Sequence, residues 1–225
     1  MLRSLLKLML MTTGTYDSFR HSVRKRMFPK YSPYDAQTQR ELILRPDPVR
    51  DHSIVMTLLT IQRDNIAGSF AERGLYRGQT SELIHNTCPD RKLYLFDTFE
   101  GISETLREGD DDRFDNTSEE YIISRLGNSQ NVIIRKGFFP DTSRGLENEA
   151  FSFVMLDADI YEITLSGLDF FYPRAVPRGY IFAHDFNNPE SNHGVSKAFK
   201  EFFHNKPEHC IEITDIYGSV VFRKI

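Results

Sequence analysis

Short apolar runs separated by helix-length segments dominate the chain from Ser69 onward. These runs are Phe70–Ala71, Leu93–Phe96, Val132–Ile134, Phe151–Leu156 and Tyr180–Ala183. Several of them are apolar almost throughout and do not alternate with polar residues, as expected for strands that are buried on both faces. Strands separated by helical segments predict right-handed β-α-β units and a parallel sheet.

The last two apolar runs follow a different pattern. Cys210–Thr214 and Ser219–Arg223 are separated only by Asp215–Gly218, and so short a connection indicates an antiparallel hairpin. A parallel sheet that ends in an antiparallel hairpin is the arrangement of class I methyltransferases, and a plain dinucleotide-binding domain lacks it. We therefore expect an α/β fold of the Rossmann-like class I methyltransferase type, with a mostly parallel seven-stranded sheet.

The first third of the chain shows weaker patterns. Apolar residues among the first eleven positions fall at helical spacing, Lys7 interrupts them, and no small-residue cleavage site follows, so an amphipathic helix fits better than a signal peptide. A second helix is predicted from about Asp51 to Ile61. We expect residues 1–65 to form a helical extension or lid and residues 66–225 to form the catalytic domain.

Composition limits the kind of protein. A chain of 225 residues that is 40% hydrophobic suffices for one α/β domain with a modest addition. The net charge of −4 gives no electrostatic reason to expect nucleic acid binding. Two cysteines are too few for a disulfide framework and suggest a reducing, cytoplasmic location. No segment reaches the ~20 apolar residues that a membrane span requires.

A glycine-containing loop follows the first predicted strand and suggests a cofactor site. Gly74 and Gly78 let a ligand approach the backbone closely, and the free N–H groups at the start of the next helix favour an anion. That anion fits the carboxylate of S-adenosylmethionine, whose ammonium Glu72 can hold directly or through water. The G-x-x-x-G spacing differs from that of NAD-binding loops, although an ordinary tight turn also explains two glycines. The loop residues assigned to the cofactor are Glu72, Gly74, Tyr76, Gly78, Thr80 and Ser81.

Residues after the second and third strands extend this cofactor site. Asp97 ends the second strand, where an acidic side chain can accept hydrogen bonds from the ribose hydroxyls of an adenosine. Thr98 and Phe99 follow it and are assigned to the same site. After the third strand, Gly137 and Phe138 are placed to sandwich the adenine. The alternative is that Phe138, with the next phenylalanine, belongs to the core.

Acidic residues close the fourth and fifth strands and suggest a metal site. Asp157 and Asp185 follow long apolar runs on strands that we expect to be neighbours, and a divalent cation would offset the cost of placing carboxylates there. All-oxygen ligation suits Mg²⁺ or another hard cation. The cation would bind the acceptor hydroxyl, lower its pKa and aim its oxygen at the methyl carbon. Alternatively, the two aspartates cap the following helices.

The role of His184 depends on how the fifth strand ends. Successive strand residues point to opposite faces, so a persisting strand would direct only Asp185 into the site. If the strand has already bent, His184 is a metal ligand or a general base. His193 is a weaker candidate for the base. We assign His184 to catalysis and to the metal, and Asp157 to catalysis, the metal and the cofactor.

Six ordered motifs from about Ile66 to the C-terminus together resemble the TylF/MycF (macrocin O-methyltransferase) family of class I S-adenosylmethionine-dependent methyltransferases. They are Ala71–Gly78, Leu95–Gly101, Lys136–Thr142, Leu156–Thr164, Phe171–Arg174 and Gly179–Phe186.

This resemblance implies a methyltransferase that uses Mg²⁺ to bind vicinal hydroxyls, often on the sugar of a secondary metabolite. It implies that the two metal aspartates are Asp157 and Asp185. The founding macrolide enzymes carry two aspartates where this chain has His184-Asp185, and Arg73 stands where an apolar residue or threonine is common. The family also has an acidic ligand from the N-terminal region of another subunit, for which Asp35 and Glu41 are candidates. We therefore expect a homo-oligomer.

The leading hypothesis is a metal-assisted O-methyltransferase that acts on a sugar or polyol hydroxyl, with no nucleic acid partner. A second hypothesis keeps the methyltransferase without the metal, with His184 or His193 as base. A third is a non-catalytic module that binds an adenosine ligand. An NAD-dependent oxidoreductase comes last.

Overall fold

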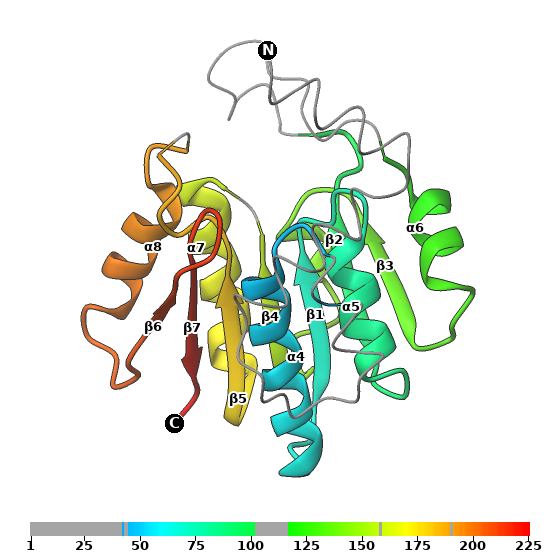
Figure 1. Cartoon of the computed structure of the whole chain (residues 1–225), viewed down its shortest axis with the longest axis horizontal. Helices are drawn as coiled ribbons and strands as arrows, with labels where there is room; N and C mark the ends of the chain where they lie inside the picture. The colour runs from blue at the N-terminus through cyan, green and yellow to red at the C-terminus, as the bar shows by residue number, and fades with distance from the viewer. Residues whose placement is uncertain (1–41, 43–44, 102–116, 158, 190) are drawn as a thin grey trace, which may run out of the picture. The chain divides into compact units, whose positions relative to one another are not determined.

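The computed structural model describes residue 42 and residues 45–101, 117–157, 159–189 and 191–225 (Figure 1). The chain divides into two compact units, Met1–His52 and Ser53–Ile225, and each is considered by itself. The predicted N-terminal amphipathic helix and the candidate ligands Asp35 and Glu41 lie outside the described residues. The proposed boundary between residues 65 and 66 stays a prediction.

The described part of the first unit leads into a helix. Helix α4 spans Pro48–Arg63 and contains the predicted segment from Asp51 to Ile61. Asp47 precedes this helix, and its Oδ1 accepts a hydrogen bond from the Arg50 amide at 3.2 Å, as an N-capping carboxylate does. Arg45 pairs with the Asp51 carboxylate within the same unit.

The second unit alternates strands and helices in the order that the apolar runs predict. The elements are β1 (Ser69–Arg73), α5 (Gln79–Thr87), β2 (Leu93–Asp97), α6 (Glu119–Leu126), β3 (Val132–Lys136), a 3-10 turn η1 (Asp141–Ser143), β4 (Phe151–Leu156), α7 (Tyr161–Phe171), a 3-10 turn η2 (Tyr172–Arg174), β5 (Ala175–Ala183), α8 (Gly194–Phe203), β6 (Ile211–Ile213) and β7 (Ser219–Arg223).

The strands form one seven-stranded sheet in the order β3-β2-β1-β4-β5-β7-β6. The first five strands in this order are parallel to one another. Strand β7 runs antiparallel to both β5 and β6, so the C-terminal hairpin is present as predicted. The connection reverses at β1, from which β2 lies on one side and β4 on the other. In such sheets ligands bind beyond the carboxyl ends of the strands at this switch point.

Alternating side chains divide the core between the two faces of the sheet. On β4, Phe153 and Met155 belong to one cluster and Val154 and Leu156 to the other. The first cluster includes α4, α5 and α6, and the second includes α7 and α8. Figure 1 shows α4 and α5 in front of the sheet. Every residue of β1 and β4 is buried, which explains why β4 is apolar almost throughout, whereas β1 buries the polar side chains of Glu72 and Arg73 at its carboxyl end.

The two cysteines differ in their exposure to solvent. Cys88 is buried as expected of a small apolar residue, whereas Cys210 is exposed. Within the described ranges, no helix combines the length and apolar character that crossing a bilayer requires.

Candidate active site

The loop after β1 is forced against the end of β4. Gly74 has a φ of +85°, and a Cβ at this position would lie 1.8 Å from the carbonyl oxygen of Asp157. The Asp157 amide in turn donates to the carbonyl of Arg73 at 2.9 Å, which extends the β1–β4 pairing by one step. Only glycine allows the two backbones to approach so closely. The predicted cofactor loop and the predicted metal ligand Asp157 are therefore adjacent.

Glu72 stabilises the start of α5. This residue is 1% exposed, and its Oε2 accepts a hydrogen bond from the Ser81 hydroxyl at 2.6 Å. Gly78 precedes the helix with a left-handed φ of 67°, and Thr80 is buried in the first turn. Tyr76, by contrast, is 41% exposed at the tip of the loop. Glu72 thus fixes the helix N-terminus towards which an anion would be drawn.

Asp97 links the loop after β1 to the loop after β2. Its Oδ2 accepts from the Leu75 amide at 2.7 Å, and its Oδ1 accepts from the Phe99 amide at 2.7 Å. An ionised carboxylate has about four acceptor positions, so two such bonds leave capacity for the hydroxyls of a ribose. The Thr98 hydroxyl donates to the Gly101 carbonyl at 3.0 Å and stabilises the same turn.

The segment after β3 separates its two phenylalanines. The Gly137 amide donates to the Asp97 carbonyl at 2.9 Å, which places this segment beside Asp97. Phe138 is 53% exposed, whereas Phe139 stacks on Phe171 with ring centroids 5.7 Å apart. The core alternative therefore describes Phe139 and not Phe138, whose ring is exposed one residue after Gly137.

Asp157, His184 and Asp185 converge where β4 and β5 end. Nδ1 of His184 lies 2.7 Å from Oδ2 of Asp185 and 3.2 Å from Oδ1 of Asp157. One ligand atom from each residue lies within 4.8 Å of the other two. The His184 and Asp185 side chains are 8% and 7% exposed and that of Asp157 is 24% exposed, so the cluster is buried but open on the Asp157 side.

The end of β5 explains why both His184 and Asp185 enter the cluster. The strand ends at Ala183, and Asp185 has a left-handed φ of 56°. This turn breaks the alternation that would have sent the two side chains to opposite faces. The interpretation that only Asp185 faces the site, which assumed a persisting strand, is therefore wrong, and the alternative of a bent strand describes the structure.

Asp159 and Asn188 contact the cluster, although no role for them was predicted from the sequence. Asn188 donates to Oδ1 of Asp185 at 2.9 Å. Burial raises the pKa of Asp159 strongly, and its hydrogen bond with Asp185 and the charges of Asp185 and Asp157 act in the same direction. Burial opposes ionisation of Asp185, but hydrogen bonds from His184 and Asp159 outweigh it and hold the pKa of Asp185 low. The Asp-Ala-Asp spacing was the available signal for Asp159.

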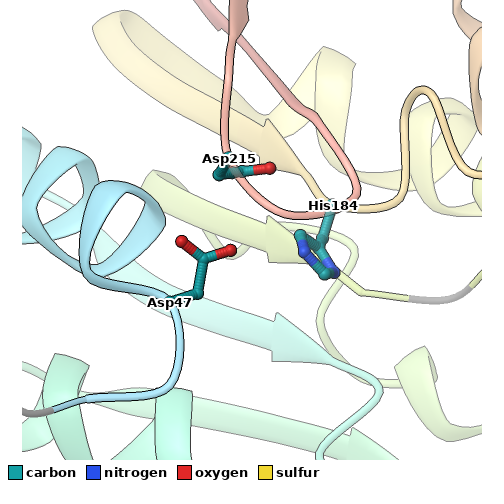
Figure 2. Close-up of side chains that lie close together, drawn as sticks. All are labelled: Asp47, His184 and Asp215. Atoms are coloured by element: carbon teal, nitrogen blue, oxygen red, sulfur yellow. The ribbon is translucent and has the colours of Figure 1, made fainter. Parts of the chain in front are cut away.

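The surroundings of His184 and His193 differ, and this difference bears on which of them is the catalytic base. Figure 2 shows the His184 imidazole near the end of β5 and Asp215 on the connection between β6 and β7. The Tyr217 ring on that connection lies 6.1 Å from the His184 ring at an interplanar angle of 83°. His193 is exposed at the start of α8 and is not one of the three clustered ligands. The structure therefore favours His184 over His193 as the reactive histidine.

The unusual residue Arg73 has its partners on the face of β1 opposite to Glu72. Its guanidinium lies 4.2 Å from the centroid of Phe139 and donates to the hydroxyl of Ser166 at 2.9 Å. It also donates to the carbonyl of Ile163 in the first turn of α7. Arg73 thus joins the segment after β3 to α7.

The donor set tests whether a divalent cation suits these residues. Two carboxylates and one imidazole lie together in mostly buried surroundings, and the carboxyl group of Asp159 interacts with both aspartates. Burial, together with the charges of Asp185 and Asp157, raises the pKa of Asp159. A cation would neutralise this charge, so the residues present fit one. The loop from Gly74 to Ser81, together with Asp97, likewise fits a ligand that carries an amino-acid carboxylate and a ribose.

A family model and several known proteins match this chain. The family model of macrocin-O-methyltransferase (TylF) matches residues 50–224. The curated relatives include an 8-demethyl-8-(2,3-dimethoxy-alpha-L-rhamnosyl)-tetracenomycin-C 4'-O-methyltransferase of Streptomyces olivaceus, which is 25% identical over 146 residues, 56% of each chain. A demethyldecarbamoylnovobiocin O-methyltransferase of Streptomyces niveus is 25% identical over 142 residues, 55% of this chain and 54% of the relative. The matches thus span just over half the length of these relatives.

Solved structures confirm the predicted fold class. The O-methyltransferase NovP superposes with a TM-score of 0.66 at 20% identity, covering 92% of this chain and 88% of its own. The calicheamicin methyltransferase CalS11 gives a TM-score of 0.62 at 17% identity, covering 88% of this chain and 95% of its own. The fold is therefore that of class I methyltransferases.

Proposed function

Since the chain belongs to the macrocin O-methyltransferase (TylF) family, we propose that it is an S-adenosylmethionine-dependent O-methyltransferase whose acceptor is a hydroxyl of a sugar or of a glycosylated small molecule. The observation that carries this proposal is the contact between the loop at Gly74 and the carbonyl of Asp157. Because of that contact, the predicted methyl-donor loop lies next to the acidic cluster, where an acceptor hydroxyl would be held.

The donor would lie across the carboxyl ends of β1, β2 and β3. The α5 N-terminus, fixed by the bond between Ser81 and Glu72, would receive the amino-acid carboxylate. Asp97 would accept the ribose hydroxyls, and the exposed ring of Phe138 would lie against the adenine. The sulfonium would then lie near Asp157, which follows β4, the strand paired with β1.

Asp157, His184 and Asp185 would hold a divalent cation, which supplies Lewis-acid polarisation of the acceptor hydroxyl when it is bound. In the transfer, a lone pair of the acceptor oxygen forms a bond to the methyl carbon as the carbon–sulfur bond breaks. The sulfur keeps the electron pair of the broken carbon–sulfur bond, and a base takes the proton of the hydroxyl group. Holding the two reactants in line is the principal contribution of these residues.

The same geometry favours a second, metal-free version of the reaction. Nδ1 of His184 lies between two carboxylates, which stabilise an imidazolium and fix the orientation of the ring. In this version His184 itself takes the proton from the acceptor hydroxyl. Removal of divalent cations separates the two versions.

The acceptor class is inferred from the relatives. One of them is named for methylation of a rhamnosyl group on tetracenomycin, and CalS11 is described as a TDP-rhamnose 3'-O-methyltransferase. The acidic end of β5 disfavours a strongly anionic acceptor, and its carboxylates can accept hydrogen bonds from hydroxyl groups. A sugar hydroxyl is therefore the proposed acceptor.

The test is transfer of a labelled methyl group from S-adenosylmethionine to a panel of glycosylated acceptors, with a divalent cation and with EDTA. We expect product with the cation, little with EDTA, and loss of turnover in Asp157→Ala and Asp185→Ala. Asp141→Ala is the control, because Asp141 forms a surface pair with Arg144. If S-adenosylhomocysteine binds but no acceptor is methylated, the protein is a binding module. Turnover that is indifferent to EDTA supports the metal-free version.

A further inference from the structure

The cation site has an unusual mixture of donor atoms for an ion such as Mg²⁺. The clustered ligands are two carboxylates and one imidazole, and the nitrogen that faces the carboxylates is Nδ1 of His184. Mg²⁺ binds through oxygen ligands, whereas imidazole suits first-row transition-metal ions. The donor set therefore is not all oxygen, because it includes a nitrogen of His184, the residue that the sequence assigned to the metal beside Asp157 and Asp185.

We propose that His184 is a nitrogen ligand and makes this site selective for transition-metal divalent cations such as Mn²⁺ and Co²⁺ over Mg²⁺. The inference rests on the proposed function only in that it refines which cation the cluster of Asp157, His184 and Asp185 holds.

The spacing of the donor atoms supports coordination. Ligands at about 2.1 Å from an octahedral ion stand roughly 3.0 Å apart when they are adjacent. Nδ1 of His184 lies 2.7 Å from Oδ2 of Asp185 and 3.2 Å from Oδ1 of Asp157, on either side of that value. The three groups therefore need only small rotations to share one ion.

The surroundings hold the imidazole in this orientation. The His184 amide donates to the carbonyl of Leu156 at 2.9 Å, which fixes its backbone to β4. The left-handed turn at Asp185 directs both side chains to one place, and Asn188 anchors the Asp185 carboxylate at 2.9 Å. Tyr217 packs perpendicular to the imidazole on another side. Such supports around a ligand fix its direction and increase its affinity for a metal.

Charge alone would not produce the selectivity. The carboxylates of Asp157 and Asp185 attract any divalent cation, including Mg²⁺. The added imidazole strengthens binding most for ions that form strong bonds to nitrogen, and among them Co²⁺ exceeds Mn²⁺. Replacing His184 by aspartate would supply a third carboxylate and restore an all-oxygen set that suits Mg²⁺.

The experiment is calorimetric titration of EDTA-treated, dialysed full-length protein with MgCl₂, MnCl₂ and CoCl₂ separately. We expect Mn²⁺ and Co²⁺ to bind at least about tenfold more tightly than Mg²⁺. In His184→Asp this ratio should fall towards one, mainly through tighter Mg²⁺ binding. His209→Asp is the matched control, since His209 is exposed in the segment between α8 and β6, and it should keep the wild-type ratio.

A spectroscopic measurement on the wild-type protein removes dependence on the variant. Pulsed electron paramagnetic resonance of the Mn²⁺ complex should show coupling to a ¹⁴N nucleus that changes when the histidines carry ¹⁵N. Equal affinity for Mg²⁺ and Mn²⁺, or an Mn²⁺ complex without nitrogen coupling, would overturn the inference and leave the cation-assisted methyltransferase intact. Absence of binding by any of the three ions would overturn the inference and the cation-assisted version together, while methyl transfer in EDTA would show that the methyltransferase itself stands.

Discussion

Replacing Gly74 by alanine tests the close approach that joins the donor loop to the acidic cluster. Gly74 and Gly145 have almost the same left-handed φ, +85° and +84°. A Cβ at Gly74 would lie 1.8 Å from the carbonyl oxygen of Asp157, whereas a Cβ at Gly145 would have nothing within 4 Å. Gly145→Ala is therefore a matched control for the cost of a left-handed alanine.

The two substitutions should differ by the cost of the overlap. A left-handed alanine costs roughly 1–2 kcal/mol, and the smaller entropy of the unfolded chain offsets about 0.4–1 kcal/mol of this. Gly145→Ala should therefore lower the free energy of unfolding by about 1 kcal/mol or less. In Gly74→Ala the ends of β1 and β4 must also separate by more than an ångström, which adds about 1–3 kcal/mol as in an overpacked core.

Urea denaturation of both variants measures this difference, and titration with Mn²⁺ shows whether Asp157 has moved. We expect Gly74→Ala to be at least about 1 kcal/mol less stable than Gly145→Ala and to bind the cation and S-adenosylhomocysteine more weakly. Equal stability of the two variants, with ligand affinities unchanged in both, would refute the claim that β1 and β4 meet at Asp157.

Three further predictions follow from the site. Asp97→Asn should weaken binding of S-adenosylhomocysteine by at least about tenfold and cost about 1–3 kcal/mol of stability, because an amide nitrogen would face the Leu75 or Phe99 amide. Calorimetry measures the affinity and thermal melting measures the stability. Unchanged affinity would contradict the assignment of Asp97 to the ribose. Phe138→Ala should change stability by no more than about 0.5 kcal/mol, because the Phe138 ring is 53% exposed. The same substitution should weaken binding of S-adenosylhomocysteine. An unchanged dissociation constant would count against stacking of the adenine on Phe138. The pKa of Asp159 is raised from 3.8 to about 8, mainly by burial. The folded state therefore holds a proton that the unfolded state has lost, and the free energy of unfolding falls as pH rises from about 4 to about 8. In EDTA, Asp159→Asn should lose this part of the decline, and an unaltered slope of unfolding free energy against pH would be evidence against the protonated carboxyl.

The fold was predictable because it depends on local and periodic features. Strands such as Phe151–Leu156 are buried on both faces, so their position is visible as an apolar run that is interrupted only by Ser152. The hairpin follows from two short segments rich in β-branched residues that are separated by a very short connection. Glycines 74 and 78 marked the loop, but the reason for Gly74 is a contact with Asp157, which only the pairing of β1 with β4 creates.

The details of the site depended on backbone turns that a sequence pattern does not encode. The left-handed turn at Asp185 places His184 in the cluster, whereas strand alternation alone would have removed it. Glu72 is buried and accepts a hydrogen bond from Ser81, a contact with the start of α5 that the sequence pattern did not indicate. Asp159 acquires its raised pKa from burial and from a residue on the neighbouring strand end, so its environment exists only after folding.

The most direct test of the central claim is a crystal structure of the protein with S-adenosylhomocysteine and Mn²⁺. The account predicts the ribose on Asp97, the amino-acid carboxylate at the α5 N-terminus, and the ion bound by Asp157, His184 and Asp185 beside the sulfur. Density for the nucleoside away from the carboxyl ends of β1 and β2, or for the ion at residues outside this cluster, would contradict it.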